Sequence, residues 1–305
     1  MFVTDYIYLT YTFKLSNMKK SLHFFVFLFS GIGLIVSFTS STNEIKISLN
    51  EALQKGFIDC KSSSTGSFNG QCVKLQLENN TIRPFQLFIP AGTLFHPTDQ
   101  GEQTLITVEQ QFISLAPSSN KVENIHAYCS EHSDKCPSGG TYFTIGTNKN
   151  PKFDSLFVFL KNKSLSSSQQ DIVWAISDNS PVSNISLGVK NLREIRSFLF
   201  KLTGQEEVNY SMDMATSINN QGFIEQKPIQ LKGFVSFDVP DSKWIHQEVY
   251  DENGKLKFKS NQAFEIPKGA SEYTFNIGVR NWNSGKYTLK LKEGSEVIET
   301  YPFKV

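Results

Sequence analysis

The residues best suited to chemistry lie close together, between positions 126 and 136. This segment holds two histidines, two cysteines and two carboxylates, which are His126, Cys129, Glu131, His132, Asp134 and Cys136. Imidazole nitrogens and thiolates are preferred ligands of zinc and copper, so His126 and His132 are candidate metal ligands together with the two cysteines. However, the spacing of these four residues matches no common zinc module. We therefore predict no bound metal and keep a metal site as the alternative.

The four cysteines form two close pairs along the chain, Cys60 with Cys72 and Cys129 with Cys136. In an oxidising compartment, cysteines this close usually form disulfides, so we predict the disulfides Cys60–Cys72 and Cys129–Cys136. Four cysteines allow three pairings, and the sequence alone does not choose among them.

Two further segments resemble a known family. Tyr128-Cys129 is followed by Pro-Ser-Gly at 137–139 and by Tyr142, and residues 169–174 read Gln-Gln-Asp-Ile-Val-Trp. Over residues 120–180 the order of these segments resembles the thioester domains of Gram-positive surface adhesins. Those domains carry a Tyr-Cys with a Pro-Ser-Gly-like turn, and later a helix that begins Thr-Gln-x-Ala-hydrophobic-Trp.

The resemblance implies an internal thioester. The Cys129 thiol and the Gln170 side-chain amide would condense with loss of ammonia, and an amine on a target would then attack the activated acyl group. The chain departs from the motif at Gln169, where the family has Thr, and at Ile172, where it has Ala. A disulfide to Cys136 is the competing use of the Cys129 sulfur.

The remaining sequence offers no convincing catalytic set. It lacks a nucleophile elbow, a zinc-protease helix motif and a phosphate-binding glycine loop. His96 and His246 stand alone. We predict no catalytic residues and no cofactor, so the chain is not expected to be an enzyme.

The N-terminal residues have the pattern of a secretory signal peptide. Lys19-Lys20 precedes an apolar run over residues 22–38, and small polar residues follow. We predict a signal peptide within residues 1–42, with the true start at Met18. A retained membrane anchor is the alternative. The predicted location is secreted or at the cell surface, in the periplasm or on the outer face of a bacterial envelope.

The first predicted domain, residues 43–204, is α+β. A helix is expected after Ser48 because Ser48 can cap it, Glu51 completes a capping box and Gly56 can end it. Short strands of alternating apolar and polar residues follow. Helices are then predicted over 151–162, 166–179 and 187–204.

The last of these helices carries a basic stripe. Its apolar residues recur at spacings of three and four, and we expect Lys190, Arg193, Arg196 and Lys201 to face solvent on the opposite side.

Period-two alternation returns over residues 205–305 and predicts an immunoglobulin-like β-sandwich with hairpins at Asn253-Gly254 and Glu293-Gly294. Ser-Gly-Lys-Tyr at 284–287 resembles the late strand of sorting domains recognised by Bacteroidetes-type secretion systems. The predicted fold class of the whole chain is mostly β.

The net charge gives no reason to expect a nucleic-acid partner, since 30 basic residues balance 29 acidic ones. We predict an exported, non-catalytic surface or secreted binding or adhesion protein. Its ligand would be an extracellular protein or glycan, and it would meet a membrane only through the signal segment before cleavage. The alternatives are a covalent adhesin with a Cys129–Gln170 thioester, and a secreted hydrolase or metal-binding protein.

Overall fold

The computed structural model describes residues 45–161, 163, 168–186 and 190–305. The predicted signal peptide, with its start at Met18, lies outside these residues. All of these residues belong to one compact unit, Glu44–Val305. None of the helices in the described ranges is long and apolar enough to cross a membrane.

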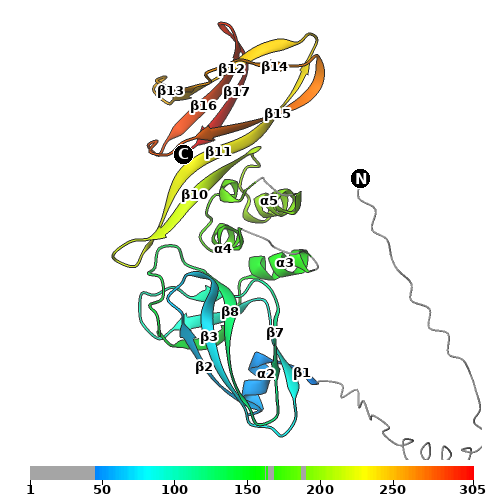
Figure 1. Cartoon of the computed structure of the whole chain (residues 1–305), viewed down its shortest axis with the longest axis vertical. Coiled ribbons are helices and arrows are strands. Elements are labelled where there is room, and N and C mark those ends of the chain that lie inside the picture. The colour runs from blue at the N-terminus through cyan, green and yellow to red at the C-terminus, as the bar shows by residue number, and fades with distance from the viewer. Residues whose placement is uncertain (1–44, 162, 164–167, 187–189) are drawn as a thin grey trace, which may run out of the picture. The chain divides into compact units, whose positions relative to one another are not determined.

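The protein is mostly β, as the sequence predicts. Within the described ranges it forms seventeen strands, four α-helices and one 3-10 helix (Figure 1). The first nine strands are β1 (Ile45–Ser48), β2 (Ile58–Ser64), β3 (Asn69–Asn79), β4 (Phe85–Ile89), β5 (Thr93–Pro97), β6 (Leu105–Ile106), β7 (Gln111–Leu115), β8 (Asn120–Cys129) and β9 (Phe143–Thr147). They form a sheet in the order β1-β4-β7 and a sheet in the order β2-β3-β8-β6-β5-β9, and one apolar core contains residues of both.

The Ser48 cap and the Gly56 stop are confirmed, whereas the Glu51 carboxylate binds Lys55 at 2.7 Å instead of completing a capping box. Helix α2 (Leu49–Gln54) begins directly after it, and the Ser48 hydroxyl accepts a hydrogen bond from the Glu51 backbone N–H at 3.2 Å. Gly56 follows the helix with a positive φ of 66°, the left-handed conformation that favours glycine.

The three later helices are also confirmed. They are α3 (Pro151–Leu160), α4 (Gln169–Ser177) and α5 (Lys190–Thr203), with the short helix η1 (Val182–Asn184) before α5. Their apolar faces form a second core, which also includes Ile106 and Tyr128 from the strands below (Figure 1). Ser168, which directly precedes α4, is in the left-handed conformation and makes no side-chain capping bond.

The basic stripe of α5 is not wholly solvated, which corrects the prediction for Arg196. Its side chain is buried, and its guanidinium donates to the carbonyl groups of Ile185, Val208 and Tyr210. Burial lowers the Arg196 pKa to about 10, so the group stays charged at neutral pH. Arg193 is exposed, as predicted, and its guanidinium lies 5.2 Å from the centre of the Phe234 ring.

The last hundred residues form two sheets that share a third core. The strands are β10 (Tyr210–Ile218), β11 (Ile224–Val239), β12 (Lys243–Asp251), β13 (Leu256–Lys259), β14 (Phe264–Ile266), β15 (Gly269–Gly278), β16 (Lys286–Glu293) and β17 (Glu296–Lys304). Hairpins occur at Gly254 and Gly294, as predicted, and both glycines have positive φ angles. The immunoglobulin-like topology and the boundary between 204 and 205 remain predictions.

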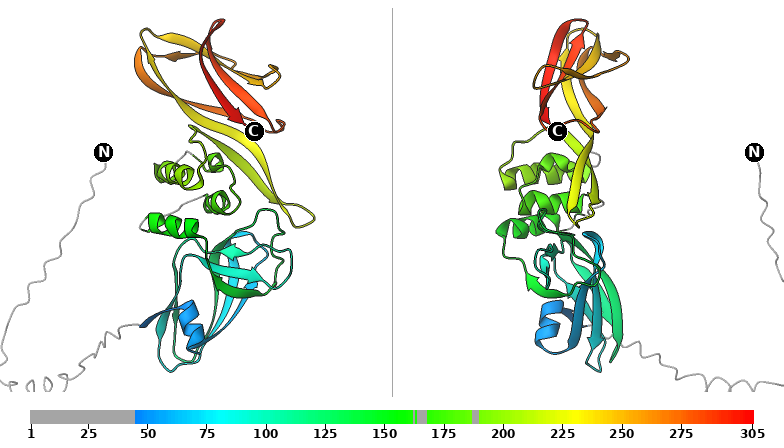
Figure 2. Two further views of the ribbon diagram at one scale, coloured as in Figure 1. Left: turned by 180° about the vertical axis from the view of Figure 1, so that it is seen from behind. Right: turned by 90° about the vertical axis from the view of Figure 1, so that its left-hand side faces the viewer.

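Strand β11 belongs to two ladders. Its second half pairs with β15, and its first half pairs only with β10 in a long hairpin. The tip of this hairpin touches the first β region, because the Cys136 backbone N–H bonds the Gly222 carbonyl at 2.8 Å and Lys135 bridges to Phe223. Figure 2 shows the hairpin running from the last β region past the helices to this contact.

Candidate functional site

Cys129 and Gln170, which the family resemblance pairs, lie in contact although 41 positions separate them. The Gln170 Oε1 atom accepts a hydrogen bond from the Cys129 backbone N–H at 3.1 Å. The Gln170 Nε2 atom donates to the Cys129 carbonyl oxygen at 2.8 Å. Because both ends of the amide bind the same residue, the amide carbon is held directly beside Cys129.

Each residue is positioned by the end of an element. Cys129 is the last residue of β8, pairs with Leu105 of β6, and also bonds the Phe68 carbonyl through its N–H. Gln170 is the second residue of α4, and the apolar face of that helix packs it toward the sheet. Both side chains are buried. A strand end and a helix start thus bring the Gln170 amide onto the backbone of Cys129.

Aromatic rings close the site on one side. Trp174 lies one turn after Gln170, is buried, and stacks on Phe68 with the ring centres 6.3 Å apart. The His132 ring meets the Trp174 ring edge-on at 4.7 Å. The indole Nε1 of Trp174 has no hydrogen-bond partner among the described residues.

A pocket of about 330 Å³ lies beside Gln170, and the Phe68 and Trp174 rings belong to its wall. Helix α4 contributes Gln170, Asp171 and Trp174 to its wall. The wall also includes Tyr128 of β8, Thr216 of β10 and Phe68, which directly precedes β3. The Asp171 Oδ1 atom accepts a hydrogen bond from the Gln226 Nε2 atom of β11 at 3.3 Å. Gln170 and Asp171 are therefore neighbours in the wall of one pocket.

Burial controls the acidity of the groups around the site. It raises the pKa of the Cys129 thiol well above its ordinary value, and the neighbouring Cys136, Cys72 and Glu131 add to this effect. It also raises the pKa of Asp171 to about 6, although the bond from Gln226 acts in the opposite direction. Cys129 is therefore a protonated thiol at neutral pH, whereas Asp171 titrates near neutrality.

Neither predicted disulfide is present, because all four cysteines are free. The β2–β3 register places Cys60 opposite Leu77, five positions from Cys72, which separates the two cysteines by roughly 16 Å along the strand. A disulfide needs Cα atoms within about 7 Å. This geometry corrects the Cys60–Cys72 prediction.

The predicted Cys129–Cys136 disulfide is also absent, because both thiols are free. The two residues follow different neighbours: Cys129 lies opposite Leu105, whereas Lys135, next to Cys136, bridges to Glu102. The Cys136 backbone N–H is bound to the Gly222 carbonyl. Cys136 therefore remains a free thiol that interacts electrostatically with Cys129.

The candidate metal ligands are not brought together. His126 is exposed on β8, while Cys129 is buried at the strand end and His132 packs on Trp174. Within the described ranges, no three His, Cys, Asp or Glu side chains are grouped closely enough to hold a metal ion.

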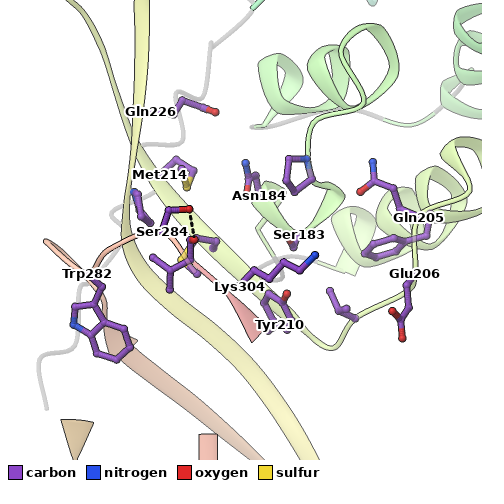
Figure 3. Close-up of a pocket in the computed structure, with 16 residues that line it drawn as sticks. Ser183, Asn184, Gln205, Glu206, Tyr210, Met214, Gln226, Trp282, Ser284 and Lys304 are labelled. Carbon is purple, nitrogen blue, oxygen red and sulfur yellow. Dashed lines mark hydrogen bonds between the residues drawn. The ribbon is translucent and has the colours of Figure 1, made fainter. Parts of the chain in front are cut away.

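A larger cavity of about 660 Å³ lies between the helices and the last β region (Figure 3). Its lining combines apolar side chains such as Met214 and Trp282 with polar ones such as Gln205 and Lys304, and includes no cysteine or histidine. Ser284 of the sorting-like segment donates to the Val305 carbonyl at 3.0 Å, the dashed bond in Figure 3. In this position the Ser284 hydroxyl fastens the edge of the last sheet.

Sequence reasoning missed Asp171 and Gln226. Asp171 adjoins Gln170 in sequence, and its position in the first turn of the predicted helix was a usable signal. Gln226 lies 55 positions from Asp171 and comes from the other β region, so nothing near it in the sequence pointed to the site.

Comparisons with known proteins add little. No protein-family model matches the sequence, and no curated protein matches it either. Solved structures similar to parts of the chain include β-glucosidase 3B from Thermotoga neapolitana (15% identity over 32% of this chain and 15% of that one, TM-score 0.20). Another is red sea bream transglutaminase (10% identity over 84% of this chain and 32% of that one, TM-score 0.19). A third is a putative β-galactosidase from Bacteroides fragilis (8% identity over 80% of this chain and 33% of that one, TM-score 0.22). The chain spans a third or less of these proteins, and the low TM-scores support no argument about function.

Proposed function

We propose that this chain is an exported adhesion protein that attaches covalently to amine-bearing targets through an internal thioester between Cys129 and Gln170. One observation carries the proposal, namely the double hydrogen bond that holds the Gln170 amide against Cys129. The family resemblance names the same two residues, and their common burial would protect an activated acyl group from water.

The chemistry needs only groups of this chain and a target amine. The Cys129 sulfur adds to the Gln170 amide carbon, the carbon–nitrogen bond breaks, and the thiol proton leaves with the nitrogen as ammonia. A target amine then attacks the same carbon and the carbon–sulfur bond breaks. The products are an amide to the target and a free Cys129 thiol. Because the site is used once, the chain would not turn over as an enzyme does.

The target class follows from this chemistry. Lysine side chains of an extracellular protein supply primary amines, whereas most glycans supply hydroxyl groups, which are weaker nucleophiles. We therefore favour a protein ligand over a glycan. The secreted or surface location agrees with the predicted signal peptide.

The test is the intact mass of the exported protein, measured without reductant. We expect a deficit of one ammonia, and methylamine should remove the deficit by adding to Gln170. The variants Cys129→Ala and Gln170→Ala should have no deficit, while Cys60→Ala, a cysteine outside the site, should keep it. A wild-type mass with no deficit, or with only the loss of hydrogens that disulfides cause, would rule out the thioester. Non-covalent binding would then be the function to pursue.

A further inference from the structure

Asp171 lines the pocket through which a target amine would approach Gln170. It follows Gln170 in the first turn of α4, and both residues belong to the wall of this pocket. An amine bound in this pocket would therefore have the Asp171 side chain among its neighbours. We propose that Asp171 accepts the proton of the attacking amine, so that it acts as the base in the covalent attachment step. This inference rests on the proposed thioester.

The surroundings of Asp171 leave the carboxylate available for this role. Among the residues that the structure describes, no lysine or arginine forms an ion pair with it. The amide of Gln226 donates a hydrogen bond to it, and this bond of 3.3 Å is long. A carboxylate in an ion pair accepts a proton less readily. Asp171 forms no such pair among the described residues, so its carboxylate can act as a base.

The pKa of Asp171 is not set by a neighbouring charge. From β3 and the loop before it, the pocket receives Phe68, Asn69 and Gly70, which are neutral, and β10 contributes the neutral Thr216. From β8 it receives Tyr128, whose own pKa burial raises to about 12, so that it stays protonated. Burial is the main influence on Asp171 and raises its pKa to about 6, near the pH at which an acceptor of protons works best.

The proton balance of the step is complete. As the amine nitrogen bonds to the Gln170 carbon, it becomes positively charged and passes one proton to the Asp171 carboxylate. The carbon–sulfur bond then breaks, and the Cys129 thiolate recovers that proton from Asp171. Because burial keeps the pKa of Cys129 well above its ordinary value, the thiolate takes the proton readily.

The experiment follows the reaction of methylamine with the full exported protein by intact mass between pH 5 and 9. Each rate is divided by the fraction of unprotonated methylamine. We expect the corrected wild-type rate to fall as the pH drops through about 6, because Asp171 becomes protonated and can no longer accept a proton. In Asp171→Asn the ammonia deficit should remain, the reaction at pH 7 should slow by about 100-fold, and the fall near pH 6 should vanish. The control Asp238→Asn removes an exposed carboxylate of β11 and should behave as wild type.

The outcomes separate the two proposals. A wild-type protein without the ammonia deficit would refute the thioester itself. A wild-type deficit with equal rates and pH profiles in Asp171→Asn would retain the thioester and refute the role of Asp171. Should Asp171→Asn fail to form the thioester, Gln226→Met provides the test, since it keeps Asp171 and removes the bond that lowers its pKa. The fall in rate should then move to higher pH, and an unmoved profile would overturn the proposal.

Discussion

Burial acts on Cys129 in two opposing ways. It raises the pKa of the thiol, which lowers the concentration of the thiolate that attacks an amide. It also excludes water, which would hydrolyse a thioester once it has formed. The hydrogen bonds between Gln170 and the Cys129 backbone offset the first effect, because they fix the amide next to this residue and so reduce the entropic cost of the attack.

Arg196 stabilises the fold through hydrogen bonds to several carbonyl groups, so its substitution should lower the free energy of unfolding. Its guanidinium satisfies carbonyl groups on both sides of the junction between the helices and β10. Arg196→Met should lower the free energy of unfolding by about 2–4 kcal/mol, because buried carbonyls lose their charged donor. Urea unfolding measures this change. Arg193→Met, an exposed neighbour that stacks on Phe234, should cost less than about 1 kcal/mol. Equal effects of the two variants would contradict the structural role of Arg196.

Among the elements, β11 has the most demanding position, since it pairs with β10 and β15 in succession. The two ladders overlap over residues 230–233, and Gly233 lies opposite Tyr210 on one side and Phe275 on the other. A methyl group at Gly233 would collide with the Phe275 ring and come within 2.9 Å of the Asn209 carbonyl oxygen. The overlap of the ladders thus depends on a residue without a side chain.

Gly233→Ala should therefore destabilise the protein by about 1–3 kcal/mol through overpacking. Thermal or urea unfolding measures the loss. Gly278→Ala is the matched control, because the new methyl group in β15 would meet nothing within 4 Å. That variant should unfold within about 0.5 kcal/mol of wild type or be slightly more stable, as the substitution restricts the unfolded chain. If the two variants have equal free energies of unfolding, the Phe275 ring can move aside to accommodate the methyl group and the prediction is wrong.

At the scale of the whole molecule, the candidate site draws on three regions of the chain. The first β region supplies Cys129, the helices supply Gln170 and Asp171, and the β10–β11 hairpin supplies Thr216 and Gln226. The hairpin tip is held on the first β region, where the Lys135 Nζ atom lies 5.7 Å from the centre of the Phe223 ring. A substitution at this tip should therefore shift the hairpin residues that contribute to the site.

Phe223→Ala should loosen the hairpin and admit water to the pocket, so that the proposed thioester hydrolyses several-fold faster. The half-life of the ammonia-deficient species in buffer, followed by intact mass, measures this effect. Phe112→Ala removes an exposed ring from β7 and should leave the half-life unchanged. Identical half-lives in Phe223→Ala and wild type would show that the hairpin does not shield the site.

Features that depend on interactions between neighbouring residues could be predicted from the amino-acid sequence alone. The cap formed by Ser48 and Glu51, the ranges of α3, α4 and α5, and the hairpin glycines Gly254 and Gly294 all follow from interactions over a few positions. The periodicity of apolar residues likewise predicted a mostly β fold, because it reports which face of each element is buried.

Features that depend on contacts between distant parts of the chain became apparent only from the tertiary structure. Spacing along the chain suggested that Cys60 joins Cys72, but the register of β2 and β3 holds them apart. The helical pattern placed Arg196 in solvent, but strand β10 and the segment before it cover it. The contact between Asp171 and Gln226 depends on a hairpin that folds back from another sheet. Strand register and the packing of distant elements leave no periodic trace near either partner, so these features had to come from the folded chain.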